Sequence, residues 1–137
     1  MKSQIENRNQ EFRRRCIEIF ERDVREGGAR PLESVLERAL AMQPHSHYLS
    51  YDTASRRIHR IHRYGIEKVV KERLAREMWR ELVGQIEDVQ ARFPRKTFDM
   101  ALTFVLNFYR PSRFYMSLDT ARRIVAPNLS YRLTRCA

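Results

Sequence analysis

Apolar side chains recur every three or four residues over most of this chain, which is the spacing of one face of an α-helix. The first such stripe consists of Ile5, Phe12, Cys16, Phe20 and Val24, and the Gly27-Gly28 pair follows it. A second stripe begins at Val70 and continues to Phe93, just before Pro94. The pattern predicts one long helix in each half of the chain.

A shorter helix is predicted after each long one. Residues 32–40 have an apolar face, and the preceding Pro31 suits the first turn of a helix. The corresponding segment of the second half runs from Thr97 to about Tyr109 and is more apolar. A proline lies a few residues beyond each segment and prevents the helix from continuing.

A third helix in each half begins with a strong N-terminal signal. Ser50 and Ser117 are good N-caps, because a serine hydroxyl can accept a hydrogen bond from a free amide of the first turn. An aspartate follows each serine at the second position, where the helix dipole favours negative charge. We expect the first of these helices to end before Gly65 and the second to be stopped by Pro127.

The two halves are related by an offset of 67 residues. Residues 44–56 align without a gap to residues 111–123, and seven of the thirteen positions are identical. The identical pairs are Pro44/Pro111, Tyr48/Tyr115, Ser50/Ser117, Asp52/Asp119, Thr53/Thr120, Ala54/Ala121 and Arg56/Arg123. This indicates a tandem duplication of a three-helix unit made of a long helix, a short helix and a Ser-capped basic helix. We therefore predict an all-α protein of about six helices, with repeats at residues 1–65 and 66–137 that share one core.

Positive charge is concentrated on the third helices. The chain has 27 Lys and Arg against 17 Asp and Glu, which gives a net charge of +10. Residues 44–65 carry +3 and residues 110–137 carry +5, whereas the long helices are nearly neutral. Such segments attract polyanions, and the planar guanidinium group can bind a phosphate or a guanine edge with two hydrogen bonds. We therefore expect a nucleic-acid-binding protein, with DNA preferred to RNA.

Eight arginines of these segments and their flanks are the candidate nucleic-acid-binding residues. They are Arg56, Arg57, Arg60, Arg63, Arg110, Arg113, Arg122 and Arg123. Arg132 and Arg135 are expected to add contacts to the nucleic-acid backbone. The alternative is a solvated basic face with no ligand, which the presence of two such helices disfavours.

The start of each third helix resembles the recognition helix of the helix-turn-helix motif. Residues 49–56 (Leu-Ser-Tyr-Asp-Thr-Ala-Ser-Arg) and 116–123 (Met-Ser-Leu-Asp-Thr-Ala-Arg-Arg) share with it an apolar residue and a Ser cap before a Thr, a small residue and an Arg. The resemblance implies groove-facing side chains at Tyr51, Asp52, Ser55, Arg56 and His59, and at Leu118, Asp119, Arg122 and Arg123. The seven residues from 44 to 50 depart from the three- or four-residue turn of that motif. Residues 113–117 also resemble short uncharacterised proteins of Bacteroidetes genomes, and no function follows from that resemblance.

Other partners fit the same charge. A protein-interaction module or homodimer whose basic face meets an acidic partner predicts a contiguous exposed apolar patch near residues 104–115. Structured RNA is a further alternative. Attachment to a membrane surface is less expected, because Ile58 and Ile61 are the main apolar residues opposite the arginines of residues 51–64.

Patterns for catalysis, metal or cofactor binding are absent from the sequence. His45 and His47, and His59 and His62, are pairs without a nearby Cys or Glu to complete a ligand set. Neither a phosphate-binding loop nor a dinucleotide-binding glycine pattern occurs. We expect no enzymatic activity, no metal and no cofactor, and we interpret Cys16 as a reduced thiol in the core.

The remaining features concern aromatic residues and the cell compartment. Tyr48 and Tyr115 are expected to pack between helices, with stacking on a base as the alternative. The longest nearly apolar run, residues 100–109, is too short to span a bilayer, and the N-terminal residues lack the apolar core of a secretory signal. The sequence therefore predicts a cytoplasmic protein that does not insert into a membrane.

Overall fold

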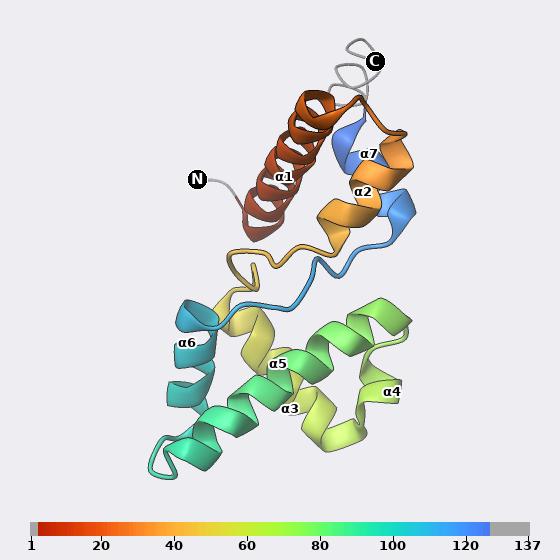
Figure 1. Ribbon diagram of the computed structural model, residues 1–137. Helices are drawn as coiled ribbons and strands as arrows, with labels where there is room; N and C mark the ends of the chain where they lie inside the picture. Colours follow the sequence, from red (N-terminus) through yellow and green to blue (C-terminus); the bar gives the residue numbers. More distant parts are fainter. Residues whose placement is uncertain (1–2, 127–137) are drawn as a thin grey trace. The chain divides into compact units, whose positions relative to one another are not determined.

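The computed structural model describes residues 3–126, and over that range the chain is all-helical. Its helices are α1 (Gln4–Glu26), α2 (Leu32–Leu40), α3 (Tyr51–Tyr64), α4 (Ile66–Val69), α5 (Arg73–Arg92), α6 (Phe98–Phe108) and α7 (Leu118–Val125) (Figure 1). The all-α prediction is confirmed. Arg132, Arg135 and Cys136 lie outside the described residues.

The predicted caps of α3 and α7 are present and nearly identical. The Ser50 hydroxyl accepts a hydrogen bond from the amide of Thr53 at 3.2 Å, and Ser117 accepts one from Thr120 at 3.1 Å. Each serine hydroxyl also donates to the hydroxyl of the same threonine, at 2.9 and 3.0 Å. Gly65 ends α3 with a positive φ of 88°, and its amide donates to the Ile61 carbonyl at 2.8 Å. These local signals fix where both third helices begin.

The long helix expected from Val70 begins at Arg73 in the structure, and a short helix, α4, precedes it. The short helix α4 ends at Val69, and Val70 adopts an extended conformation before α5 begins. Two hydrogen bonds hold this break: the Glu72 side chain accepts from the Leu74 amide at 3.3 Å, and Arg76 Nε donates to the Val70 carbonyl at 2.7 Å. The consecutive β-branched valines also have a low helix propensity. Val70, the first residue of the apolar stripe, therefore lies in the bend before α5 and not on the helix itself.

The chain folds into two compact units (Figure 1). Unit 1 combines the chain up to residue 44 with the part after residue 111, and so contains α1, α2 and α7. Unit 2 consists of residues 45–111 and contains α3, α4, α5 and α6. Each unit has its own apolar core, in place of the single core that we expected. The third helix of each predicted repeat packs in the unit built on the other repeat, so the unit limits differ from the expected division after residue 65.

Unit 1 is built around the buried face of α1. Phe12 and Cys16 are fully buried against α2 and α7, and the Phe12 ring meets the Phe114 ring edge-to-face at 5.3 Å. The amide of Phe114 donates to the Leu40 carbonyl at 3.1 Å, which fixes the segment before α7 to the end of α2. Burial raises the pKa of the Cys16 thiol to about 12, as expected for an unreactive core thiol.

Unit 2 is built around α5, α6 and one face of α3. Ala54 and Ile58 are fully buried among side chains of α5 and α6 that include Leu82 and Leu102. Ile61 is partly buried on the same face of α3. Because the buried residues of α3 follow helical spacing, the opposite face of this helix is left to solvent.

Positions paired by the 67-residue offset are buried in matching places. The buried pairs are Phe12/Trp79, Ile19/Ile86, Val35/Leu102, Ala54/Ala121 and Ile58/Val125. Each pair has one member in each unit, so α1, α2 and α7 of unit 1 correspond to α5, α6 and α3 of unit 2. The duplication itself stays a prediction from the sequence.

Candidate nucleic-acid interface

Three arginines line the solvent-facing side of α3. Burial of Ala54 and Ile58 turns Arg56, Arg60 and Arg63 outward, and all three are exposed. They are four and three residues apart, the spacing at which side chains of one helix face are neighbours. We call Arg56, Arg60 and Arg63 the α3 arginine row.

The arginine row has only weak contacts within the protein. Arg56 Nε donates to the Asp52 carbonyl at 3.3 Å, and the Arg63 guanidinium lies 5.3 Å from the centroid of the Tyr64 ring. Within residues 3–126, none of the three guanidinium groups forms an ion pair with a carboxylate. Their charges repel one another along one face, and an approaching polyanion relieves that repulsion.

Arg57 differs from the row although it is its neighbour in sequence. Its side chain is half-buried, and its guanidinium lies 5.7 Å from the centroid of the Trp79 ring on α5. This is a cation–π contact that joins two helices of unit 2. We therefore separate Arg57, which packs, from the three arginines that face solvent.

Two histidines of α3 lie against the start of α6. The rings of His59 and His62 are 5.0 and 6.3 Å from the ring of Phe98. His59 Nδ1 is 2.7 Å from the Ser55 carbonyl oxygen, and because a carbonyl only accepts, Nδ1 carries the hydrogen. Over the described part of the chain, no three His, Cys, Asp or Glu side chains form a group that could hold a metal ion.

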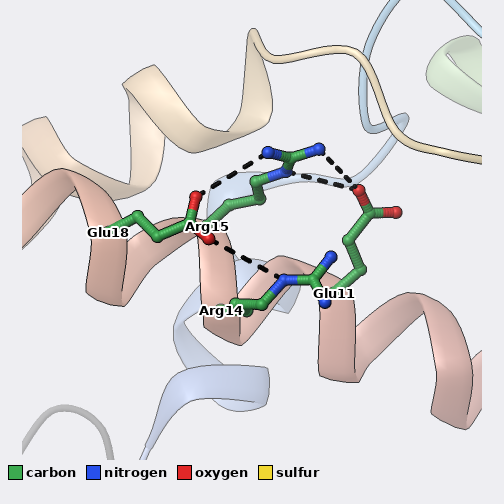
Figure 2. A network of polar contacts seen from close by, with 4 residues as sticks. All are labelled: Glu11, Arg14, Arg15 and Glu18. Carbon is green, nitrogen blue, oxygen red and sulfur yellow. Dashed lines mark hydrogen bonds and ion pairs between the residues drawn. The ribbon is translucent and has the colours of Figure 1, made fainter.

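Several basic residues of α1 and α5 are neutralised by nearby carboxylates. Figure 2 shows this on α1, where Arg15 lies between Glu11, at 3.1 Å, and Glu18, at 3.7 Å. Arg14 Nε is 3.8 Å from the same Glu18 carboxylate. On α5, Arg73, Arg80 and Arg92 also pair with carboxylates. Exposed Arg22 and Arg25 of α1 also form no ion pair with a carboxylate among residues 3–126, so what distinguishes the arginine row is that three such residues share one helix face.

The expectation of a second unneutralised helix holds only in part. Arg122 on α7 pairs with Glu33 of α2, and its guanidinium is also 3.6 Å from Asp119. Arg123 is exposed and has no carboxylate partner among residues 3–126. The partner of Arg122 is far away in sequence, so counting charges along α7 could not reveal it.

The two arginines that precede α7 are half-buried. The Arg113 guanidinium lies 5.6 Å from the Tyr115 ring centroid, and its Nε donates to the Phe114 carbonyl at 3.4 Å. Arg110 belongs to unit 2, where its carbonyl accepts a hydrogen bond from Gln85 at 2.9 Å. The eight candidates are thus divided between the units, and the structure brings Arg56, Arg60 and Arg63 together in one row.

The helix-turn-helix resemblance stays a prediction, and the packing of these helices gives it no support. That motif needs the second and third helices of one repeat to pack together. Here α2 belongs to unit 1 and α3 to unit 2, and ten residues, 41–50, connect them. Residues of α3 pack instead with α5 and α6.

An open hollow on α6 was not among the candidate sites predicted from the sequence. Its volume is about 390 Å³, and its lining includes Lys96, Met100, Thr103, Phe104, Asn107 and Phe108. Phe108 is 73% exposed and Met100 52%, although both are large apolar residues. The signal was available, because α6 is apolar on nearly every face and only one face can be buried. Of residues 104–115, where the protein-interaction alternative expects a contiguous exposed apolar patch, Phe108 is exposed and Phe104 half-buried, whereas Phe114 is buried in unit 1.

Two further findings bear on function. No helix within residues 3–126 is both long enough and apolar enough to cross a membrane. No protein-family model, curated protein or solved structure matches this chain.

Proposed function

We propose that this protein binds nucleic acid, with DNA as the preferred target, through the α3 arginine row. The observation that carries the proposal is that Arg56, Arg60 and Arg63 share one exposed helix face without a carboxylate partner among the described residues. The helix that bears them is held in the core of unit 2 by Ala54 and Ile58. The packing of α3 therefore holds the arginine row in a defined position on the surface of unit 2. We place this activity in the cytoplasm.

The dimensions of the row suit a phosphate backbone. At 1.5 Å per residue, Arg56 and Arg63 are about 10 Å apart along the helix axis. Duplex DNA carries one negative charge for about every 1.7 Å of its axis, so the row faces several phosphates. Three phosphate contacts give a loss of affinity of about 40-fold between about 50 and 200 mM salt. Exposed Arg123 would add to this dependence.

The test compares two variants of equal net charge. Replacing all three row arginines by glutamine (Arg56→Gln, Arg60→Gln, Arg63→Gln) removes their charges and keeps the helix propensity of each position. The control makes the same change to glutamine at three exposed arginines that pair with carboxylates, Arg14, Arg73 and Arg92. In a fluorescence-anisotropy titration with duplex DNA, we expect the row variant to lose binding and the control to retain most of it.

Two outcomes would contradict the proposal. If the wild-type protein does not bind DNA at low salt, it does not have this function. If both triple variants lose the same affinity, the attraction comes from the overall charge, and the arginine row has no special part in it.

A second candidate is a protein-interaction module, and the hollow on α6 favours it. Phe108 and Met100 are exposed and Phe104 is half-buried, and phenylalanine and methionine are enriched at protein interfaces. The partner would be an acidic protein, because the chain carries +10. This candidate predicts that nucleic-acid binding is weak and nearly insensitive to salt.

A further inference from the structure

We propose that the hollow on α6 is a stacking platform for unpaired nucleobases, so that unit 2 binds single-stranded nucleic acid or unpaired segments of a duplex. The inference deepens the proposed function and rests on it. An aromatic surface beside a basic helix would recognise a ligand that combines flat rings with phosphates. Aromatic side chains combined with basic residues are the usual device for binding single strands without sequence preference.

The aromatic part of the hollow is formed by two rings. The centroids of Phe104 and Phe108 are 4.9 Å apart, and the ring planes are inclined by 42°. Phe104 is half-buried and anchored against the core of unit 2, whereas Phe108 is 73% exposed. A flat base stacked on Phe108 would cover apolar surface that now faces water.

A cation lies beside these rings. Lys96 Nζ is 5.6 Å from the centroids of both Phe93 and Phe104, and the lysine lines the same hollow. Within the described residues its ammonium group has no carboxylate partner. A phosphate bound by Lys96 would bring its own nucleotide next to the phenylalanine rings.

Polar groups that line the hollow suit the edge of a base. Asn107 Nδ2 donates to the Thr103 carbonyl at 2.7 Å, which fixes the amide and leaves its oxygen and second N–H for a ligand. Asp99, the acidic residue of the hollow, accepts a hydrogen bond from the Tyr51 hydroxyl at 2.5 Å. Tyr51 is the first residue of α3, so this bond joins the edge of the hollow to the helix that bears the arginine row.

Charge selects among the possible occupants of this surface. A second copy of the chain also carries +10, so self-association would bring like charges together. An unpaired nucleotide combines a flat apolar ring with a negative phosphate. It therefore matches both Phe108 and Lys96. An acidic amphipathic helix matches the charge without using the polar groups of Thr103 and Asn107.

The experiment separates base stacking from phosphate binding. Fluorescence anisotropy measures the affinity for labelled oligothymidine of about 15 nucleotides, a length within the site sizes of such proteins, and for an abasic strand with the same number of phosphates. We expect the wild type to bind oligothymidine more tightly than the abasic strand. Phe108→Ala should weaken oligothymidine binding by roughly fivefold to a hundredfold and leave abasic binding unchanged.

Two further variants make the result specific. Phe108→Trp keeps a stacking surface and should retain the affinity for oligothymidine. Ile5→Ala removes an apolar side chain that is 61% exposed on α1 of unit 1, and should change neither affinity. Because Phe108 is itself largely exposed, Phe108→Ala should fold normally, and circular dichroism checks this.

Three results would overturn the inference. Equal wild-type affinities for oligothymidine and the abasic strand would exclude stacking. The proposed function would still hold in that case if the triple glutamine variant of the arginine row lost binding to DNA. Unchanged oligothymidine binding by Phe108→Ala would also contradict stacking. If the same variant no longer bound an acidic amphipathic Leu/Glu peptide that the wild type binds, the hollow would be a protein-binding site. Failure of the wild type to bind any strand or duplex would remove both proposals.

Discussion

His47 and Gln85 are joined by a hydrogen bond inside unit 2, with 2.7 Å between His47 Nε2 and Gln85 Oε1. The amide nitrogen of Gln85 donates to the Arg110 carbonyl at 2.9 Å, so its oxygen is the acceptor for the histidine. His47 therefore carries its hydrogen on Nε2. Its Nδ1 is buried without a hydrogen-bond partner in the described structure. The 67-residue offset pairs His47 with Phe114, which is buried in unit 1.

This arrangement predicts that the stability of unit 2 falls in mild acid. Burial lowers the pKa of His47, and the hydrogen bond to Gln85 and the charge of Glu81 only partly oppose that effect. The unfolded state then binds a proton more readily than the folded state, so stability is present at neutral pH and is lost as the pH falls below about 6.5. Urea unfolding followed by the fluorescence of Trp79, the only tryptophan, at about pH 7.5 and about pH 5 measures the loss.

Two variants test whether His47 is responsible. His47→Phe puts into unit 2 the residue that unit 1 has at the paired position, and it should reduce the difference between the two pH values. His62→Gln changes an exposed histidine and should leave that difference as in the wild type. An unaltered pH dependence in His47→Phe would assign the effect to other groups.

The N-caps of α3 and α7 should contribute similar stability. Ser50→Ala and Ser117→Ala each remove the acceptor for a first-turn amide, and each should lower the free energy of unfolding by about 1 kcal/mol. Ser50→Thr and Ser117→Thr keep the acceptor and should lose much less. Urea unfolding followed by circular dichroism measures all four. A loss in the threonine variants as large as in the alanine variants would show that packing, and not capping, decides the effect.

These caps show which part of the fold follows from local sequence. Ser50, Ser117 and Gly65 act within one helical turn, so the limits of α3 and the start of α7 could be predicted. The exchange of third helices between the units could not, because it depends on which apolar faces meet after the helices form. Both repeats have similar faces, and the sequence pattern alone does not choose between them.

Part of the candidate site could likewise be predicted from local sequence, and part depends on how the helices pack. The exposure of Arg56, Arg60 and Arg63 follows from the helical spacing of Ala54 and Ile58. The neutralisation of Arg122 depends on Glu33, which only the packing of α2 against α7 reveals. The uncovered face of α6, by contrast, could be predicted, because Asp99, Thr103 and Asn107 recur every four residues on that side of an otherwise apolar helix.

Cys16 should be protected from alkylation in the folded protein. Its side chain is fully buried and its thiol pKa is raised to about 12, so almost no thiolate forms at neutral pH. In a Cys136→Ser background, iodoacetamide should modify Cys16 only as fast as the protein opens, and rapidly in urea. Mass spectrometry follows the reaction. Modification in buffer as fast as in urea would show that the core of unit 1 is open.

Single substitutions on α3 should divide its arginines into two classes. Arg56→Gln, Arg60→Gln and Arg63→Gln should each reduce the slope of log affinity against log salt by about 0.9, because each removes one phosphate contact. Arg57→Gln should leave the slope nearly unchanged, because that guanidinium already lies over Trp79. It should instead alter tryptophan fluorescence and lower stability by about 0.5–2 kcal/mol through the lost cation–π contact.

The same titrations with Arg122→Gln extend this division to unit 1. Arg122 is paired with Glu33, so binding a phosphate would first require breaking that ion pair. We expect Arg122→Gln to change the salt slope less than any substitution in the arginine row, and Arg123→Gln, whose side chain is exposed, to change it more than Arg122→Gln. Equal effects at Arg57, Arg60 and Arg122 would mean that the existing contacts of an arginine do not determine whether it reaches the nucleic acid. The distinction between the row and its neighbours would then have no functional meaning.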